Sequence, residues 1–345
     1  MKAPQWRELP ALITARRGHT VTVLADGALL VIGGTDANGA SLDSIELLVP
    51  GAPAWVRVGH LAHPRTHHRA TLLQDNRVLV SGGIRADDVS SRIASTELVS
   101  PAIGSVEVGP ELRFARSDHQ AVLAGNGDLW MLGGTDGAVV PPPELLRRGG
   151  RRFERGPALQ PSQSPLLAWS TKDGVVAIVG NVLRAKSPIP KYSRWLNAGY
   201  APLPPVVTEL SRTGASVVTH RLPPTEGVFV GQTRRGTVVF TDSGMWLVWI
   251  YDPASRTFTA APSPPPGLDT WQIVQGPAGT VIAFNQHVTY SFDGETWTDL
   301  VAMPADAYEI TTATTVDSLV LVGGMDRRRP DRGVTDRVIA LSISP

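Results

Sequence analysis

The 345-residue sequence contains no cysteine. This absence excludes a disulfide framework and catalysis by a thiol. Lysine is also scarce and occurs only at positions 2, 172, 186 and 191. Such a strong preference for arginine is typical of GC-rich bacterial genomes. We therefore expect a bacterial protein whose fold and function depend on neither cross-links nor thiol chemistry.

A strong charge of one sign and long apolar runs are absent as well. The formal net charge is +1, so no global field favours nucleic acid, and no recognition-helix pattern is present. No stretch of 18 consecutive apolar residues occurs, and Met1 to His19 is interrupted by charges and prolines. These features argue against a transmembrane helix and a signal peptide. We expect a cytoplasmic protein with no nucleic-acid or membrane partner.

One phrase recurs through the first 150 residues. It consists of Arg-x-x-His, a short apolar stretch, Gly-Gly, and a later stretch that carries a glutamate. A period of about 50 residues with this pattern is typical of a four-stranded propeller blade. The three copies are Arg16 to His19 with Gly33-Gly34 and Glu46, Arg65 to His68 with Gly82-Gly83 and Glu97, and Arg116 to His119 with Gly133-Gly134 and Glu144. In these motifs the sequence resembles the kelch-repeat family.

The resemblance implies an all-β fold, a seven-bladed kelch-type β-propeller. Residues 6–9 read as the outermost strand of a blade whose other three strands close the sequence, near 308–315, 318–324 and 335–342. Pairing of the N-terminal strand with this C-terminal blade would close the ring and remove two open sheet edges. A chain of this length with 42% hydrophobic residues can bury ample core. We expect a single domain over residues 1–345.

The central part of the chain matches the repeat less well. Blade four keeps Thr208-Glu209-Leu210 but has no Arg-x-x-His, and the next two blades lack both signatures. Blades five and six are therefore predicted from alternating strand patterns and hairpin signals alone. The match to the family is specific over residues 11–160 and the last 40 residues.

The repeated residues are expected to build the fold. Paired glycines permit positive φ angles and close approach of backbones near a crowded axis. The recurring arginines and histidines are expected to bridge neighbouring strands and to satisfy buried polar groups. Residues that return at the same place in successive blades explain a fold better than a unique site. We give this structural interpretation to His19, His68 and His119, and to the repeated glutamates.

No metal or other cofactor is expected. The chain cannot form the copper-linked tyrosine–cysteine cofactor of galactose oxidase, a kelch-like enzyme, because it has no cysteine. His60, His63, His67 and His68 crowd near one blade junction. Residues three apart on an extended chain are separated by about 10 Å, which is too far to share one ion without a turn at Pro64. Nucleotide-binding, hydrolase and zinc-peptidase motifs are absent as well.

The resemblance implies that a ligand would bind on one rim, where the loops after the second strands meet the loops between blades. A rigid scaffold that projects variable loops is the usual arrangement of a binding site. An insertion loop at 181–205 combines cations with aromatic residues and is expected to be a lid over an anionic, partly apolar ligand, or else a solvated insertion. The residues expected to contact the ligand are Arg85, Arg184, Lys186, Lys191, Tyr192, Arg194, Trp195, Tyr200, Trp271, Arg327 and Arg328.

Two classes of function remain open. The first is binding of an anionic, partly apolar small molecule or an acidic peptide on the rim. The second is a cofactor-independent acid–base enzyme, an isomerase, cyclase or lyase, in which arginines hold an anionic substrate while rim side chains exchange protons. An enzyme would have a deep pocket, and a peptide binder a wide, shallow bowl. The candidates for proton exchange are Asp36, His67, Asp118, Asp136 and Asp326.

Overall fold

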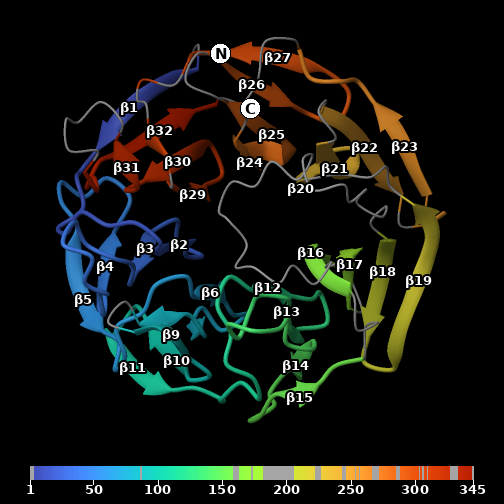
Figure 1. Ribbon diagram of the computed structural model, residues 1–345. Coiled ribbons are helices and arrows are strands. Elements are labelled where there is room, and N and C mark those ends of the chain that lie inside the picture. The colour runs from blue at the N-terminus through green and yellow to red at the C-terminus, as the bar shows by residue number, and fades with distance from the viewer. Residues whose placement is uncertain are drawn as a thin grey trace.

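Four-stranded antiparallel sheets stand around a common centre in the computed structural model (Figure 1). Within the described residues there are seven such sheets, two further two-stranded sheets and one short 3-10 turn, η2 (Pro277–Gly279). This confirms the expected all-β propeller. The structure describes residues 4–85, 88–157, 163–171, 174–181, 206–221, 227–242, 246–252, 254–255, 257–265, 272–284, 288–302, 304, 307–308, 310–326 and 333–343.

The first three sheets in chain order follow the three clear sequence repeats, and in each of them successive strands lie progressively farther from the centre. The first contains β2 (Thr20–Val23), β3 (Leu29–Ile32), β4 (Ser44–Leu48) and β5 (Val56–His60). The second contains β6 (Arg69–Leu72), β7 (Val78–Ser81), β10 (Thr96–Ser100) and β11 (Ser105–Val108). The third contains β12 (Gln120–Leu123), β13 (Leu129–Leu132), β14 (Glu144–Leu146) and β15 (Glu154–Arg155).

The next three sheets come from the part of the chain where the repeat is weak. The fourth contains β16 (Gln163–Ser170), β17 (Val175–Asn181), β18 (Val206–Ser211) and β19 (Gly214–Arg221). The fifth contains β20 (Gly227–Thr233), β21 (Gly236–Asp242), β22 (Trp246–Asp252) and β23 (Thr257–Ala261). The sixth contains β24 (Gln272–Gln275), β25 (Val281–Phe284), β26 (Thr289–Phe292) and β27 (Trp297–Leu300).

The last sheet combines the two ends of the chain. From the centre outward it contains β29 (Thr311–Thr314), β30 (Ser318–Val322), β32 (Val338–Ser342) and β1 (Gln5–Leu9). Strand β1 pairs with β32 in antiparallel register from Gln5 opposite Ser342 to Leu9 opposite Val338. The innermost strands contact one another in the order β2, β6, β12, β16, β20, β24, β29 and back to β2. The two-stranded sheets are β8 (Ile84–Arg85) with β9 (Asp88–Arg92), and β28 (Ala307–Tyr308) with β31 (Met325–Asp326).

The hydrophobic core lies in layers between neighbouring sheets. All four residues of β3 are buried, as are those of β7 and β13. Alternate residues of a strand point to opposite faces: Leu29 and Val31 pack toward the last sheet, whereas Leu30 and Ile32 pack toward the second. A strand that is covered on both faces needs apolar residues throughout, which explains the continuous apolar run before each Gly-Gly pair.

A buried ion pair repeats in the first three sheets. Arg65 Nη2 donates to Glu97 Oε1 at 2.6 Å, and neither side chain is more than 4% exposed. Arg65 also donates to the carbonyl of Gly82 at 3.0 Å, while Glu97 accepts the backbone N–H of Ala62 at 2.6 Å. The same contacts recur for Arg16 with Glu46 and for Arg116 with Glu144. Each pair ties the segment that enters a sheet to that sheet's second and third strands.

The repeated histidines are buried between neighbouring sheets. His68 Nε2 is 3.1 Å from Thr20 Oγ1 of the first sheet, and His119 Nε2 is 3.0 Å from Ser81 Oγ of the second. Burial lowers the pKa of His19 to about 3, with a further contribution from the charge of Arg16. Burial, and the charges of nearby arginines, also hold the pKa of His68 and of His119 well below the usual value.

Stability is therefore expected to fall as the pH is lowered from 7 to 5. These histidines are neutral in the folded protein, whereas in the unfolded chain they take up protons below a pKa of about 6.5. The unfolded state then binds more protons, so each histidine lowers the free energy of unfolding by up to roughly 1.4 kcal/mol per pH unit below that pKa. Thermal unfolding of the wild type and of His119→Gln between pH 5 and 7 measures this slope.

The slope should be smaller in His119→Gln, which has one buried imidazole fewer. His60→Gln is the matched control, because the His60 side chain is 54% exposed and pairs with Asp43 on the surface. It should reproduce the wild-type slope. Equal slopes for wild type and His119→Gln would contradict the prediction.

Candidate functional site

One end of the propeller brings together the two sets of loops that were predicted from the sequence to form the rim. Isolated β-bridges join Arg17 with Thr35, Thr66 with Ile84, and Ser117 with Thr135. Each bridge connects the second residue of an Arg-x-x-His phrase with a residue that directly follows the Gly-Gly pair. The loop between blades and the loop after the second strand therefore lie side by side in each of the first three sheets.

The third residue of the phrase has an unusual backbone in all three repeats. Gly18, His67 and Asp118 have φ angles of 61°, 54° and 55°. A hydrogen-bond chain links these positions, since His67 N–H donates to the Gly18 carbonyl at 3.1 Å and Asp118 N–H donates to the His67 carbonyl at 3.0 Å. A positive φ suits glycine and costs other residues about 1–3 kcal/mol. Two non-glycine residues are thus held in a strained conformation on this rim.

The side chains of these two residues contact each other. His67 Nδ1 lies 2.8 Å from Asp118 Oδ1, and the side chains are 37% and 57% exposed. Ser117 Oγ donates to Asp118 Oδ2 at 3.0 Å. Partial burial raises the pKa of Asp118, but the hydrogen bond and charge of His67, together with Ser117 and Arg69, outweigh it and leave the pKa below its usual value. Asp118 is therefore a carboxylate at neutral pH and orients the imidazole.

Arg69 adds a positive charge beside this pair. It begins β6, the innermost strand of its sheet, yet it is exposed. Arg69 Nε donates to the carbonyl of His119 at 2.5 Å, which fixes the side chain next to Asp118. Arg69 was not predicted from the sequence as a site residue, although the first and third repeats have the neutral residues Thr20 and Gln120 at that position.

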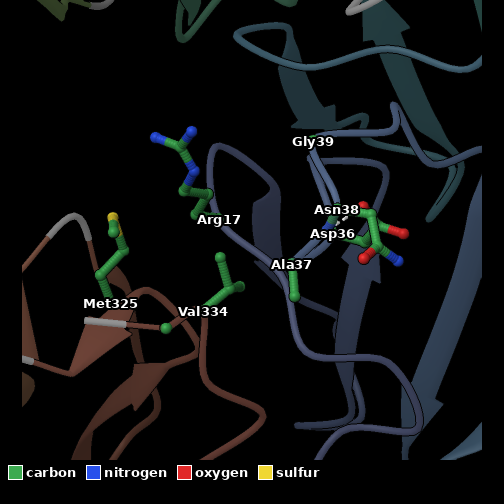
Figure 2. Close-up of a pocket in the computed structure, with 8 residues that line it drawn as sticks. Arg17, Asp36, Ala37, Asn38, Gly39, Met325 and Val334 are labelled. Atoms are coloured by element: carbon green, nitrogen blue, oxygen red, sulfur yellow. Dashed lines mark hydrogen bonds between the residues drawn. The ribbon is translucent and has the colours of Figure 1, made fainter. Parts of the chain in front are cut away.

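A pocket opens at the junction of the first and last sheets. Its volume is about 360 Å³. Figure 2 shows the side chains of Met325, Val334 and Ala37 below Arg17, whose guanidinium extends away from them in this view. The pocket thus combines a small apolar surface with one guanidinium group and one carboxylate, that of Asp36, whose Oδ1 is engaged by backbone N–H groups of its own loop. The residues that line it are Arg17, Asp36, Ala37, Asn38, Gly39, Met325, Gly333 and Val334.

Asp36 and Asp136, two of the residues predicted to transfer protons, stabilise turns in their own loops through hydrogen bonds to the backbone. Asp36 Oδ1 accepts the backbone N–H groups of Asn38 and Ala40, both at 2.9 Å. Asp136 Oδ1 accepts those of Ala138 and Val139 at 2.8 and 2.7 Å. Such turns are a common use of aspartate in loops, so these hydrogen bonds favour a loop-fixing role for both carboxylates.

The remaining predicted residues are distributed as follows. Arg85 is exposed at the end of β8, and Asp326 pairs with Ala307 in the small sheet of β28 and β31. The predicted lid at 181–205 lies outside the described residues apart from Asn181, which ends β17. Its role stays a prediction from the sequence. Also outside the described residues are Arg184, Lys186, Lys191, Tyr192, Arg194, Trp195, Tyr200, Trp271, Arg327 and Arg328.

The histidines at 60–68 are directed to different partners. His60 pairs with Asp43 at 3.0 Å, His67 pairs with Asp118, and His68 is buried against Thr20. Across the described part of the chain, no group of three or more His, Cys, Asp or Glu side chains is placed to hold a metal ion.

A solved structure with a similar fold is a fungal alcohol oxidase of the AA5 family in complex with copper. The TM-score is 0.69 at 13% sequence identity, and the match covers 99% of this chain and 77% of the oxidase chain. No family model and no curated protein matches the sequence. None of the described helical segments is long and apolar enough to cross a membrane.

The oxidase structure contains copper. Among the described residues of this chain, no group of three His, Cys, Asp or Glu side chains is placed to hold a metal ion, and the sequence has no cysteine. The likeness to the oxidase at 13% identity concerns the fold, and on that basis the chain is a β-propeller protein.

Proposed function

We propose that this protein is a kelch-type propeller of seven blades, closed by its N-terminal strand, that binds a small anionic and partly apolar molecule on its loop rim. The kelch assignment is supported by the three Arg-x-x-His repeats with their buried glutamate partners. The closure is supported by the antiparallel register between β1 and β32.

The observation that carries the binding function is the Arg17 pocket. A guanidinium group attracts a carboxylate or phosphate, and a charge-assisted hydrogen bond is stronger than a neutral one. The side chains of Ala37, Met325 and Val334 offer apolar contact for a short hydrocarbon part of the same ligand. At about 360 Å³ the pocket is within the size range of small-molecule sites, which favours a small molecule over an acidic peptide.

Hexanoate is a suitable probe because it combines a carboxylate with a short apolar chain. Arg17→Gln is expected to weaken hexanoate binding about tenfold, which corresponds to about 1.4 kcal/mol. The effect should be larger at low salt than at high salt, since salt screens exposed charges. Calorimetric titration of both proteins with hexanoate, and with acetate and hexan-1-ol as matched compounds, measures the charged and apolar contributions separately.

Arg147→Gln is the control variant. Arg147 is an exposed arginine that pairs with Glu154 on an outer hairpin, so its loss should leave hexanoate binding unchanged. Equal affinity of wild type and Arg17→Gln would contradict the proposal. Equal affinity for hexanoate and hexan-1-ol would do the same, because an anion site must distinguish them.

A second candidate function is cofactor-independent acid–base catalysis on such an anion. It is favoured by one observation, the 2.8 Å contact between His67 and Asp118 beside Arg69. An imidazole oriented by a carboxylate is a common general base. The pair lies close to the Arg17 pocket. The His67 N–H donates to the carbonyl of Gly18, and Gly18 directly follows Arg17 in the sequence.

A further inference from the structure

We propose that His67 Nε2 moves a proton to and from the carbon next to the carbonyl group of a small 2-oxo acid, with Asp118 orienting the imidazole and Arg69 holding the developing anion. This inference rests on the acid–base candidate function and assigns its atoms and its substrate class. It concerns a site next to the Arg17 pocket, so it can fail while anion binding in that pocket holds.

The imidazole of His67 is oriented for proton exchange with a ligand. Its Nδ1 is engaged by Asp118, which leaves Nε2 as the nitrogen that can exchange a proton. Gly18 lies across from Nε2, and a Cβ atom at that position would be 3.7 Å from Nε2. Because position 18 is glycine, it adds no side chain over this nitrogen. With 37% of its side chain exposed, His67 is open to a small molecule on the rim.

His67 and Asp118 are two of the four described non-glycine residues with a positive φ. The third residue of the Arg-x-x-His motif can be glycine, because Gly18 of the first repeat takes the same left-handed conformation at φ 61°. His67 and Asp118 occupy it at a cost of about 1–3 kcal/mol each. Strain of this kind is found at functional sites, where the surrounding structure holds it. The side chains of His67 and Asp118 also contact each other.

The guanidinium of Arg69 supplies a cation beside the pair. Its Nε is committed to the His119 carbonyl, and its two Nη groups lie outside that bond. They are donors of the type that binds a carboxylate or an enolate oxygen. A positive charge at this place stabilises negative charge as it develops during proton abstraction. An imidazole can abstract a carbon-bound proton that an adjacent carbonyl makes acidic, and a guanidinium binds a carboxylate. A 2-oxo acid meets both conditions.

The proposed step conserves atoms and electrons. Nε2 takes the proton from C3 of the 2-oxo acid, the C–H electron pair forms a C2–C3 double bond, and the carbonyl electrons move to the C2 oxygen to give an enolate. The imidazolium then returns a proton to C3 and restores the ketone. In heavy water the returned particle is a deuteron, so the reaction is seen as exchange at C3. The step requires neither an oxidant nor a reductant.

Deuterium exchange at C3 of 2-oxobutanoate, followed by proton NMR in heavy water, tests the inference. The wild type should accelerate exchange over buffer. The exchange rate of His67→Gly should be at least about 100-fold lower than that of the wild type, as expected for removal of a general base. Added imidazole should restore part of the rate. Asp118→Asn should lower kcat for exchange with little change in KM. Both variants should melt at or above the wild-type temperature, because glycine and asparagine tolerate a positive φ.

Asn76→Gly is the matched control. Asn76 has a φ of 63° in a hairpin turn away from the rim, so the substitution relieves the same strain without touching the site. It should retain the wild-type exchange rate. The inference is overturned if the wild type does not exceed buffer, or if His67→Gly exchanges as fast as the wild type.

Hexanoate titration of the same proteins separates the two proposals. Binding of hexanoate without catalysed exchange would overturn the proton-transfer inference and leave the Arg17 pocket supported. Catalysed exchange without hexanoate binding would support the proton-transfer inference and contradict the proposal that the Arg17 pocket binds an anion.

Discussion

A chain that lacks residues 1–10 is expected to melt roughly 5–10 °C below the full-length protein. The deletion removes β1, whose five residues are in register with β32, and it exposes β32, in which Val338 to Leu341 are buried. At about 0.5–1.5 kcal/mol for each hydrogen bond, loss of this ladder costs several kcal/mol. One kcal/mol corresponds to about 2–4 °C in domains of 150–250 residues. Thermal unfolding followed by circular dichroism measures the shift.

The contacts of Trp6 give an independent reason for the same result. Its indole N–H donates to the carbonyl of Val301 at 3.0 Å, as Trp55 donates to Pro10 at 2.8 Å and Trp297 to Pro262 at 3.0 Å. Trp6 therefore occupies the position that outermost-strand tryptophans take elsewhere in the ring. The deletion removes a contact to the preceding sheet in addition to the ladder.

Two variants separate loss of the strand from shortening of the chain. Deletion of residues 1–3, which precede β1, should leave the melting temperature unchanged. Replacement of residues 5–9 by glycine and serine at full length should reproduce the effect of the large deletion. A full deletion that melts like the wild type would show that pairing of the chain ends contributes nothing to stability.

The repeated part of the fold could be predicted in detail because its chemistry is local. The apolar runs before Gly33-Gly34, Gly82-Gly83 and Gly133-Gly134 become the fully buried strands β3, β7 and β13. The glycines have the positive φ angles that the crowded strand ends require, for example 60° and 99° at Gly33 and Gly34. A Cβ at Gly33 would lie 2.6 Å from the Arg65 carbonyl, so no other residue fits there.

The middle of the chain could be predicted only coarsely, because other residues replace the repeated ones. Glu209 of the fourth sheet corresponds to the repeated glutamates, yet no Arg-x-x-His precedes that sheet. The hydroxyl of Tyr251, from β22 of the next sheet, donates to Glu209 at 3.2 Å. A partner that comes from a different sheet leaves no fixed spacing in the sequence.

The sequence predicted His67 and Asp118 as candidate site residues, but it did not predict that their side chains contact each other. His67 and Asp118 are 51 positions apart, and their contact arises because equivalent positions of neighbouring repeats lie side by side on the rim. Their conformation could not be anticipated either, since a positive φ is expected for glycine rather than for histidine or aspartate. Asp36 and Asp136 resembled acid–base groups in the sequence, but their hydrogen bonds to following N–H groups depend on the loop conformation.

Glu97→Gln is expected to lower the free energy of unfolding by about 3–5 kcal/mol, because it leaves the charge of Arg65 buried without a counter-ion. The Arg65 side chain is fully buried, so water cannot replace the lost carboxylate. Arg65→Met should also destabilise the protein, since the carbonyls of Gly82 and Ser95 lose a donor and Glu97 loses its cation. Denaturant unfolding at neutral pH measures both changes.

The double variant Arg65→Met/Glu97→Gln decides whether the pair acts as a unit. Removal of both charges leaves no buried ion, so the double variant should lose less than the sum of the two single losses, by roughly 1–3 kcal/mol. Arg77→Met with Asp75→Asn is the matched exposed pair, with side chains 41% and 50% exposed, and its coupling should be about 0–1 kcal/mol. Additive losses at Arg65 and Glu97 would show that the two residues stabilise the propeller independently, through their separate backbone contacts. Strong coupling would assign that stabilisation to the ion pair, which the first three repeats share.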